Sequence, residues 1–295
     1  MTSTSAARPS RVVDAHVHLW DPARTDWYPY LSRGQAGLNM GDVTGMSRRF
    51  DVPTYRSEAA GWNVEKLVNV AAATGRHSVE ETLELDGRAA TDGHPDAIIG
   101  GLPPGSTAEV IAAIDRQCAA ARFRGVRPMG AAEAGLPAPD VLRALRDRGL
   151  VFELMAHPDQ LVDAAAGLEG HPDLVVVVEH AGWPRNDGAD ERELWRLGID
   201  ALAGVGENVL CKLSGLAMPL HSMAADVLAP WVEYAIEAFG VDRCLFASNF
   251  PVDGLHGSFD QLYTAYADIT AGLDDDARDK LFAANAERVY RLSEN

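Results

Sequence analysis

Short apolar runs recur along the chain, and helical spacing follows each of them. The runs cover residues 12–20, 67–71, 97–102, 123–127, 151–155, 174–178, 209–213 and 244–247. Nearly continuous apolar character is typical of parallel strands that helices cover on both faces. Eight such strands alternating with helices predict an α/β fold, a (β/α)8 TIM barrel.

Helix starts are visible between these runs. Three segments fit a capping box, in which a short polar side chain caps a backbone N–H and an acid three residues later reaches back: Ser78 with Glu81, Ser106 with Glu109, and Asp190 with Glu193. The helical segments begin where a barrel requires them, after each strand.

The connection between the first two strands is far longer than an ordinary barrel loop. It runs from residue 21 to 66 and is rich in aromatic and basic side chains, among them Tyr28 and Tyr30. A loop at the carboxyl end of a barrel strand lies at the mouth, so we expect it to form part of a substrate pocket or its lid. The alternative is a surface flap that covers helices.

Composition places the chain among globular proteins with one domain. Residues 1–10 are rich in Ser, Thr and Ala and should form a disordered tip, and residues 11–295 should form the barrel. The sequence shows no signal-peptide h-region and no apolar run of about 18 residues. Three scattered cysteines indicate reduced thiols. We therefore expect a cytoplasmic protein that does not bind membranes.

The formal net charge of −17 argues against a nucleic-acid partner, because phosphate binding needs a basic patch. The expected partner is a small-molecule substrate, and homo-oligomer formation is left open. An anionic substrate would need local Arg or Lys side chains to bind it.

Two histidines stand two residues apart on the first apolar run. Side chains alternate along a strand, so His16 and His18 should share one face, and Asp14 with them. Two neighbouring imidazoles can bind one cation or one anionic group. The alternative is one hydrogen-bonded core histidine and one that faces solvent.

Other polar side chains follow later strands, where barrel enzymes place their active sites. They are Arg127, Glu153, His180, Lys212, Ser248, Asn249 and Asp253. Arg127 suits bidentate binding of a carboxylate, and Glu153 and Lys212 are further candidates for substrate binding. Structural alternatives remain, since Arg127 could pair with Glu153 and Lys212 could extend out of the barrel.

Five motifs at these strand ends occur in a fixed order. They are VDAHVHLWDP (13–22), FRGVR (123–127), VEHAGWP (178–184), CKLSGL (211–216) and FASNFPVD (246–253). Together they resemble the amidohydrolase superfamily, and within it the amidohydrolase-2 branch that includes sugar-lactone and 2-pyrone-4,6-dicarboxylate lactonases. The resemblance extends from residue 12 to the C-terminal helix.

The resemblance implies a hydrolase that opens a small, carboxylated or sugar-derived lactone by water attack on the ester carbonyl. His16, His18 and His180 would bind one divalent metal ion, Zn²⁺ or Mn²⁺, or would polarise the carbonyl without a metal. Arg127 would bind a substrate carboxylate. The pocket would be shaped by Tyr28, Tyr30 and Trp183.

The chain departs from the family at the last strand, where Ser248-Asn249 stands in place of Ser-Asp. An amide does not accept a proton at neutral pH, so the usual base is missing and a metal should be weakly held. Asp253 or Glu153 could supply the carboxylate, or a histidine could act as base. Two other functions stay open: a decarboxylase of a small unsaturated or aromatic acid, and a barrel that binds a ligand without turnover.

Overall fold

The computed structural model describes residues 6–31, 42–129 and 135–292. Eight strands form one parallel sheet in chain order: β1 (Val12–Val17), β2 (Val64–Val70), β3 (Ala97–Leu102), β4 (Phe123–Pro128), β5 (Val151–Leu154), β6 (Val176–Val178), β7 (Val209–Leu213) and β8 (Cys244–Phe246). Just beyond β8, Phe250 forms a parallel bridge with Val17 and its carbonyl accepts a hydrogen bond from the His18 amide at 2.8 Å. This contact brings the first and last strands together, so the predicted TIM barrel is confirmed.

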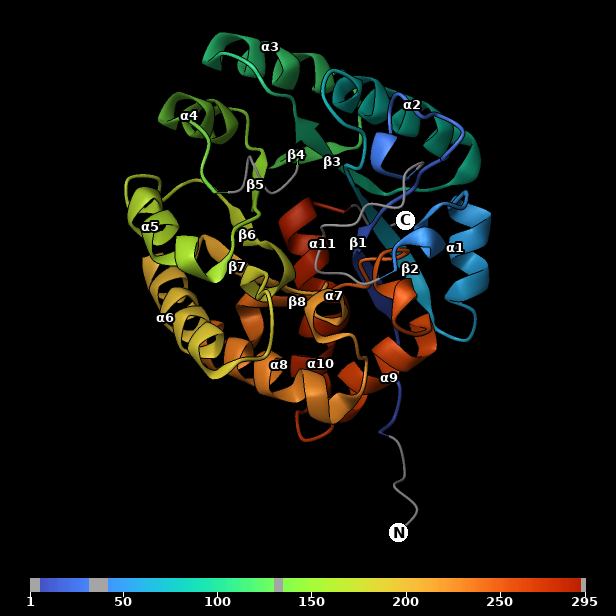
Figure 1. The fold of residues 1–295 in the computed structure, drawn as a ribbon, viewed down its shortest axis with the longest axis vertical. Helices are drawn as coiled ribbons and strands as arrows, with labels where there is room; N and C mark the ends of the chain where they lie inside the picture. The colour runs from blue at the N-terminus through green and yellow to red at the C-terminus, as the bar shows by residue number, and fades with distance from the viewer. Residues whose placement is uncertain (1–5, 32–41, 130–134, 293–295) are drawn as a thin grey trace.

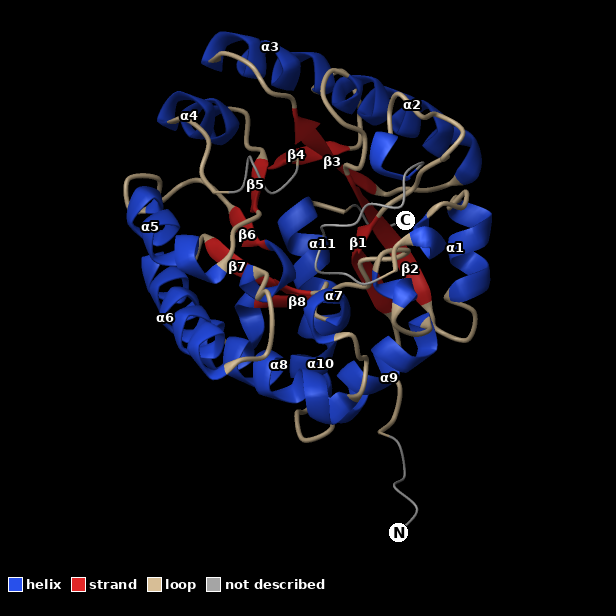
Figure 2. Ribbon diagram, viewed as in Figure 1, coloured by secondary structure: helices blue, strands red, loops and turns tan. Residues whose placement is uncertain are grey.

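The helices form an outer ring around the strands, except α7 and α11, which are seen inside this ring (Figures 1 and 2). They are α1 (Val52–Glu58), α2 (His77–Asp92), α3 (Thr107–Gln117), α4 (Pro139–Asp147), α5 (Pro158–Leu168), α6 (Ala189–Val205), α7 (Ala217–Leu220), α8 (Ala225–Phe239), α9 (Phe259–Ile269), α10 (Asp275–Asp279) and α11 (Asn285–Tyr290). In the described part of the chain, each helix is too short or too polar to span a bilayer.

The barrel interior has an apolar lower part. Val13 and Ala15 of β1 belong to one buried cluster with apolar residues of the other strands, and Val289 and Tyr290 of α11 pack into the same cluster. A much larger apolar layer lies between the strands and the surrounding helices. The interior of the barrel therefore contains a buried apolar cluster to which β1 and α11 both contribute.

Of the three capping boxes predicted from the sequence, the structure confirms one. Ser106 and Glu109 form both bonds of the predicted capping box at the start of α3. The prediction for Ser78 and Glu81 is wrong, because α2 already begins at His77 and the Glu81 carboxylate accepts backbone hydrogen bonds from another segment. The box at residue 190 is also wrong, since α6 begins at Ala189.

The long connection after β1 contains two short 3₁₀ helices, Pro29–Leu31 and Thr44–Met46, and then α1. Its residues 32–41 lie outside the described residues. Trp20 and Phe50 pair in an antiparallel bridge, and Tyr30 donates a hydrogen bond to the Ala72 carbonyl just after β2, at 2.8 Å. The described part with Tyr30 thus lies at the carboxyl end of β2, as expected for a loop at the mouth.

The N-terminal segment is described from residue 6. Arg8 forms an ion pair with Asp260 at 2.6 Å and its guanidinium lies 4.5 Å from the ring centroid of Trp62. The expected disordered tip spans residues 1–10, of which 1–5 lie outside the described residues. In the described remainder, Arg8 is held against the barrel.

Candidate functional site

His16 and His18 direct their rings to the same point. Their Nε2 atoms lie 3.2 Å apart, and His18 Nδ1 lies 2.8 Å from the Val70 carbonyl oxygen. A carbonyl only accepts, so Nδ1 of His18 carries the proton and its Nε2 presents a lone pair to His16. Burial, aided by the charge of Arg127, lowers the pKa of His18 to about 3. Burial also lowers the pKa of His16, so both rings stay neutral at neutral pH.

Asp14 does not share the face of the histidines, and that expectation was wrong. Its carboxylate accepts hydrogen bonds from the Ser248 amide and from the Tyr55 hydroxyl of α1, each at 2.8 Å. The pairing of β1 with β2 shifts register between Asp14 and Val17, which breaks the strict alternation of side chains. Asp14 therefore ties the strand to its neighbours and leaves the site to the imidazoles.

His180 joins them from the turn after β6. Its ring centroid lies 4.8 Å from that of His16, and its Nδ1 lies 3.0 Å from Ser214 Oγ. The backbone of His180 is left-handed, with φ 53°. Gly215 makes room for the ring, because a Cβ there would lie 2.3 Å from His180 Nδ1. The three histidines, predicted from two separate motifs, thus meet at one end of the barrel.

Lys212 and Glu153 form an ion pair inside the barrel. The ammonium lies 2.6 Å from both carboxylate oxygens, and both side chains are fully buried. Tyr290 of α11 adds a hydrogen bond to Glu153 Oε1 at 2.6 Å. Neither alternative from the sequence holds: Lys212 does not extend out of the barrel, and the partner of Glu153 is Lys212 rather than Arg127.

Glu179 is a site residue that the sequence reasoning did not single out. It directly follows β6 and is fully buried, and its carboxylate lies 3.4 Å from Arg127 Nη1. Burial and the neighbouring Glu153 raise the pKa of the Glu179 carboxyl. Its place at the carboxyl end of an apolar strand, immediately before His180, was the available signal.

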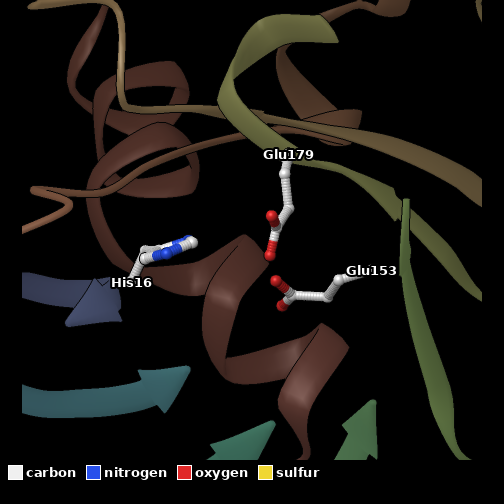
Figure 3. A group of neighbouring side chains, drawn as sticks. All are labelled: His16, Glu153 and Glu179. Atoms are coloured by element: carbon white, nitrogen blue, oxygen red, sulfur yellow. The ribbon is translucent and has the colours of Figure 1, made fainter. Parts of the chain in front are cut away.

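Three buried side chains offer ligand atoms to one cation. One atom each from His16, Glu153 and Glu179 lies within 4.8 Å of the others. Figure 3 shows the three side chains converging from β1, β5 and the turn after β6. Glu153 fits least, because Lys212 occupies both of its oxygens. Glu179 Oε2 accepts no hydrogen bond from the described residues. This carboxylate oxygen is therefore the one available to a cation.

The histidine pair fits a cation better than Glu153 does. The separation of 3.2 Å between Nε2 of His16 and Nε2 of His18 is close to that of two nitrogens on one zinc ion, given Zn–N bonds of about 2.0–2.1 Å. The hydrogen bond from His18 Nδ1 to the Val70 carbonyl fixes the ring as partners of metal-bound histidines do. His16 and His18 thus offer two nitrogen donors to a divalent ion, and a carboxylate oxygen of Glu179 lies within 4.8 Å of a His16 ring nitrogen.

Arg127 is buried beside this cluster without a close bidentate partner. Its Nη1 lies 3.5 Å from Glu179 Oε1, its Nη2 lies 3.6 Å from Met155 Sδ, and its Nε donates to the Pro128 carbonyl at 3.2 Å. These contacts are long for a guanidinium, which forms bonds of about 2.7–2.9 Å to a well-placed carboxylate. The guanidinium N–H groups of Arg127 therefore form only long contacts in the described structure, so they are available to bind a carboxylate.

The aromatic candidates take different positions. Trp183 stacks on His157 with ring centroids 4.5 Å apart, and its ring lies 6.0 Å from that of His180. Tyr28 donates its hydroxyl to Glu81 at 3.0 Å rather than into the histidine cluster. Trp183 therefore lies beside the histidine cluster, while the hydroxyl of Tyr28 binds the Glu81 carboxylate of α2 outside this cluster.

Asn249 and Asp253 form a pair next to the histidines. Asn249 is left-handed, with φ 56°, a conformation that Asn tolerates, and its amide N–H donates to the His16 carbonyl at 2.8 Å. Its side-chain Nδ2 donates to Asp253 Oδ1 at 2.9 Å. Burial raises the pKa of Asp253 to about 7. Asn249 thus stands between the Asp253 carboxylate and β1.

Curated relatives cover nearly the whole chain. An uncharacterized protein of Sinorhizobium fredii, y4mH, is 33% identical over 95% of this chain and 98% of its own length. An L-fucono-1,5-lactonase of Burkholderia ambifaria is 26% identical over 95% of each chain. An L-fucono-1,5-lactonase of Burkholderia multivorans is 28% identical over 96% of each chain.

A solved structure shares the architecture. An amidohydrolase of Burkholderia multivorans crystallised with bound zinc superimposes with a TM-score of 0.81 at 24% identity, over 96% of this chain and 100% of that one. The sequence pattern of the Amidohydrolase family, Amidohydro_2, matches residues 13–292, which include all the site residues above and all of the strands except Val12 of β1. The chain therefore belongs to the Amidohydrolase (Amidohydro_2) family.

Proposed function

We propose that this protein hydrolyses a small lactone that carries a carboxylate or derives from a sugar. The observation that carries the proposal is the convergence of three neutral histidines, Glu179 and Arg127 at the carboxyl end of the strands. The lactonases at 26–28% identity support the same reaction class. Ring opening needs a polarised carbonyl, a proton acceptor for water and a group that orients the substrate.

Arg127 would orient the substrate by binding a carboxylate. Its present contacts, at 3.4–3.6 Å to Glu179 and Met155, leave short charge-assisted bonds unmade. A divalent cation bound by the nitrogens of His16 and His18 would supply Lewis-acid polarisation of the ester carbonyl. Without a cation, the neutral rings of His16 and His18 still direct their Nε2 atoms to the same point.

Glu179, Asp253 and a histidine are the candidate proton acceptors for water. Glu153 suits this role less, because Lys212 and Tyr290 together donate three hydrogen bonds to it. Glu179 faces the cluster directly, whereas Asp253 reaches it through Asn249. Glu179→Gln and Asp253→Asn separate the two when the metal content of each variant is measured beside kcat. Loss of the acceptor lowers kcat at unchanged metal content, whereas loss of a metal ligand lowers both.

The decisive experiment combines metal analysis with a lactone panel. Purified protein is assayed by acid release at constant pH against L-fucono-1,5-lactone, a carboxylated lactone and an uncharged lactone, with and without chelator. We expect acid release from at least one lactone, and restoration by Zn²⁺ or Mn²⁺ after chelation if the cation takes part. Carbon dioxide release without lactone opening would replace the proposal by the decarboxylase, and binding without turnover would replace it by the ligand-binding barrel.

A further inference from the structure

Glu81 is a buried carboxylate of α2 that lies outside the histidine cluster. Its Oε2 accepts the Ala72 amide at 3.0 Å, and its Oε1 accepts the Ala73 amide and the Tyr28 hydroxyl, each at 3.0 Å. Its side chain is 2% exposed. A buried carboxylate is costly unless hydrogen bonds satisfy it, so this arrangement calls for a specific role.

The three donors come from two segments that border the site. Ala72 and Ala73 follow β2, whose last residue, Val70, accepts the hydrogen bond from His18. Tyr28 belongs to the long connection after β1. Glu81 therefore joins the end of β2 to the loop that the sequence predicts to lie over the barrel mouth.

Further hydrogen bonds join the same two segments, the loop after β1 and the residues that follow β2, and we call this contact the junction. The Tyr30 hydroxyl donates to the Ala72 carbonyl at 2.8 Å, and the Thr74 amide donates to the Trp27 carbonyl at 2.9 Å. Tyr30 packs edge-on against Trp20 at 6.4 Å, and Trp20 stacks on His18 at 5.7 Å between ring centroids. The loop residues thus reach the catalytic histidine both through the backbone after β2 and through a stack of rings.

A cavity of about 170 Å³ lies next to the junction. Glu81, Tyr28, Trp20 and Trp27 are among its lining residues. Tyr28 is buried in the apolar core on its other side. The hydrogen bond to Glu81 therefore adds to this packing by fixing the hydroxyl of Tyr28 beside the cavity.

We propose that Glu81 is a positioning residue of the substrate site, which holds the Trp27–Tyr30 part of the loop against the end of β2. The inference rests on the proposed lactone hydrolysis, because it assigns the loop to the substrate pocket. Glu81 acts through Tyr28 and through the backbone of Ala72 and Ala73, and it does not touch the reacting atoms.

Glu81→Gln and Tyr28→Phe test the junction in the whole protein. Gln preserves the volume but turns an NH2 group toward donors, so we expect KM to rise roughly 10- to 100-fold while kcat stays within about threefold. Tyr28→Phe should raise KM less, and the double variant should match Glu81→Gln, because the two residues act as one unit. Tyr234→Phe is the matched control, since its hydroxyl binds the Asp200 carboxylate on the outer helices at 2.9 Å.

Hydrogen exchange supplies a readout that needs no turnover. In Glu81→Gln, the amides of Ala72 and Ala73 and the segment 27–31 should exchange faster, while β5 to β7 keep the protection of the wild type. Unchanged exchange in these segments, or faster exchange with unchanged KM, would overturn the role of Glu81. If the wild type opens no lactone, the proposed function fails, and selective exchange at Ala72, Ala73 and residues 27–31 then decides whether Glu81 holds the loop against the end of β2.

Discussion

The Lys212 ammonium lies 2.6 Å from both carboxylate oxygens of Glu153, in the interior of the barrel and out of reach of solvent. The pair joins β7 to β5, and Tyr290 adds a third hydrogen bond from α11. Mutual attraction and hydrogen bonds here offset the cost of removing two charges from water. The partners therefore depend on each other.

Lys212→Met should lower the free energy of unfolding by about 3–5 kcal/mol, because it leaves the Glu153 charge buried without a cation. The double variant Lys212→Met/Glu153→Leu should lose less than the single variant. Denaturant unfolding of both variants measures the difference. A double variant that is less stable than Lys212→Met would contradict the mutual dependence.

Arg127→Met should raise KM for a carboxylated lactone by a factor on the order of 10 to 1000, since it removes a charge-assisted contact. KM for an uncharged lactone should change much less. Steady-state kinetics with the two substrates measure the contrast. Equal kinetics of variant and wild type on the carboxylated lactone would remove Arg127 from substrate binding.

His16→Ala should reduce lactone hydrolysis by about 100-fold or more, the range found for the loss of a group that stabilises a developing oxyanion. Thermal unfolding should change little, because Nδ1 of His16 has no partner in the described structure and its Nε2 faces His18. Kinetics and a melting curve on the same preparation test both statements. Retained turnover together with a large loss of stability would make His16 a core residue.

Asp253 should make stability depend on pH. Burial raises the pKa of its carboxyl from 3.8 to about 7, so the folded protein binds this proton more tightly than the unfolded chain. The contribution of Asp253 is therefore most favourable below pH 4 and is lost as the pH rises to 7. Asp253→Asn removes this titration. The stability of the wild type relative to the variant should fall by about 4 kcal/mol over that range, measured by denaturant unfolding at each pH.

A constant difference in unfolding free energy between wild type and Asp253→Asn, from pH 4 to pH 7, would show that the carboxyl titrates normally. The same variant informs on catalysis. A normal rate in Asp253→Asn at neutral pH would leave Glu179 or a histidine as the proton acceptor for water.

The sequence by itself determined the architecture and most of the candidate site. Continuous apolar runs followed by helical spacing specify parallel strands under helices, because a strand buried on both faces needs apolar residues at every position. Polar residues at the strand ends, such as His16, His180 and Arg127, then had to meet, since parallel strands in a barrel bring their carboxyl ends together.

Tertiary structure alone decided how the charged groups pair. Glu153 and Lys212 are 59 positions apart, and Tyr290 joins them from a helix 137 positions beyond Glu153. Local pattern cannot show such partners, because they depend on which strands face each other across the barrel. The register shift after Asp14 turned it away from the histidines, and the fold brought Glu179 toward them. The orientation of Asp14 depends on the local register of β1, and the position of Glu179 depends on long-range packing. The alternation of side chains along a strand encodes neither.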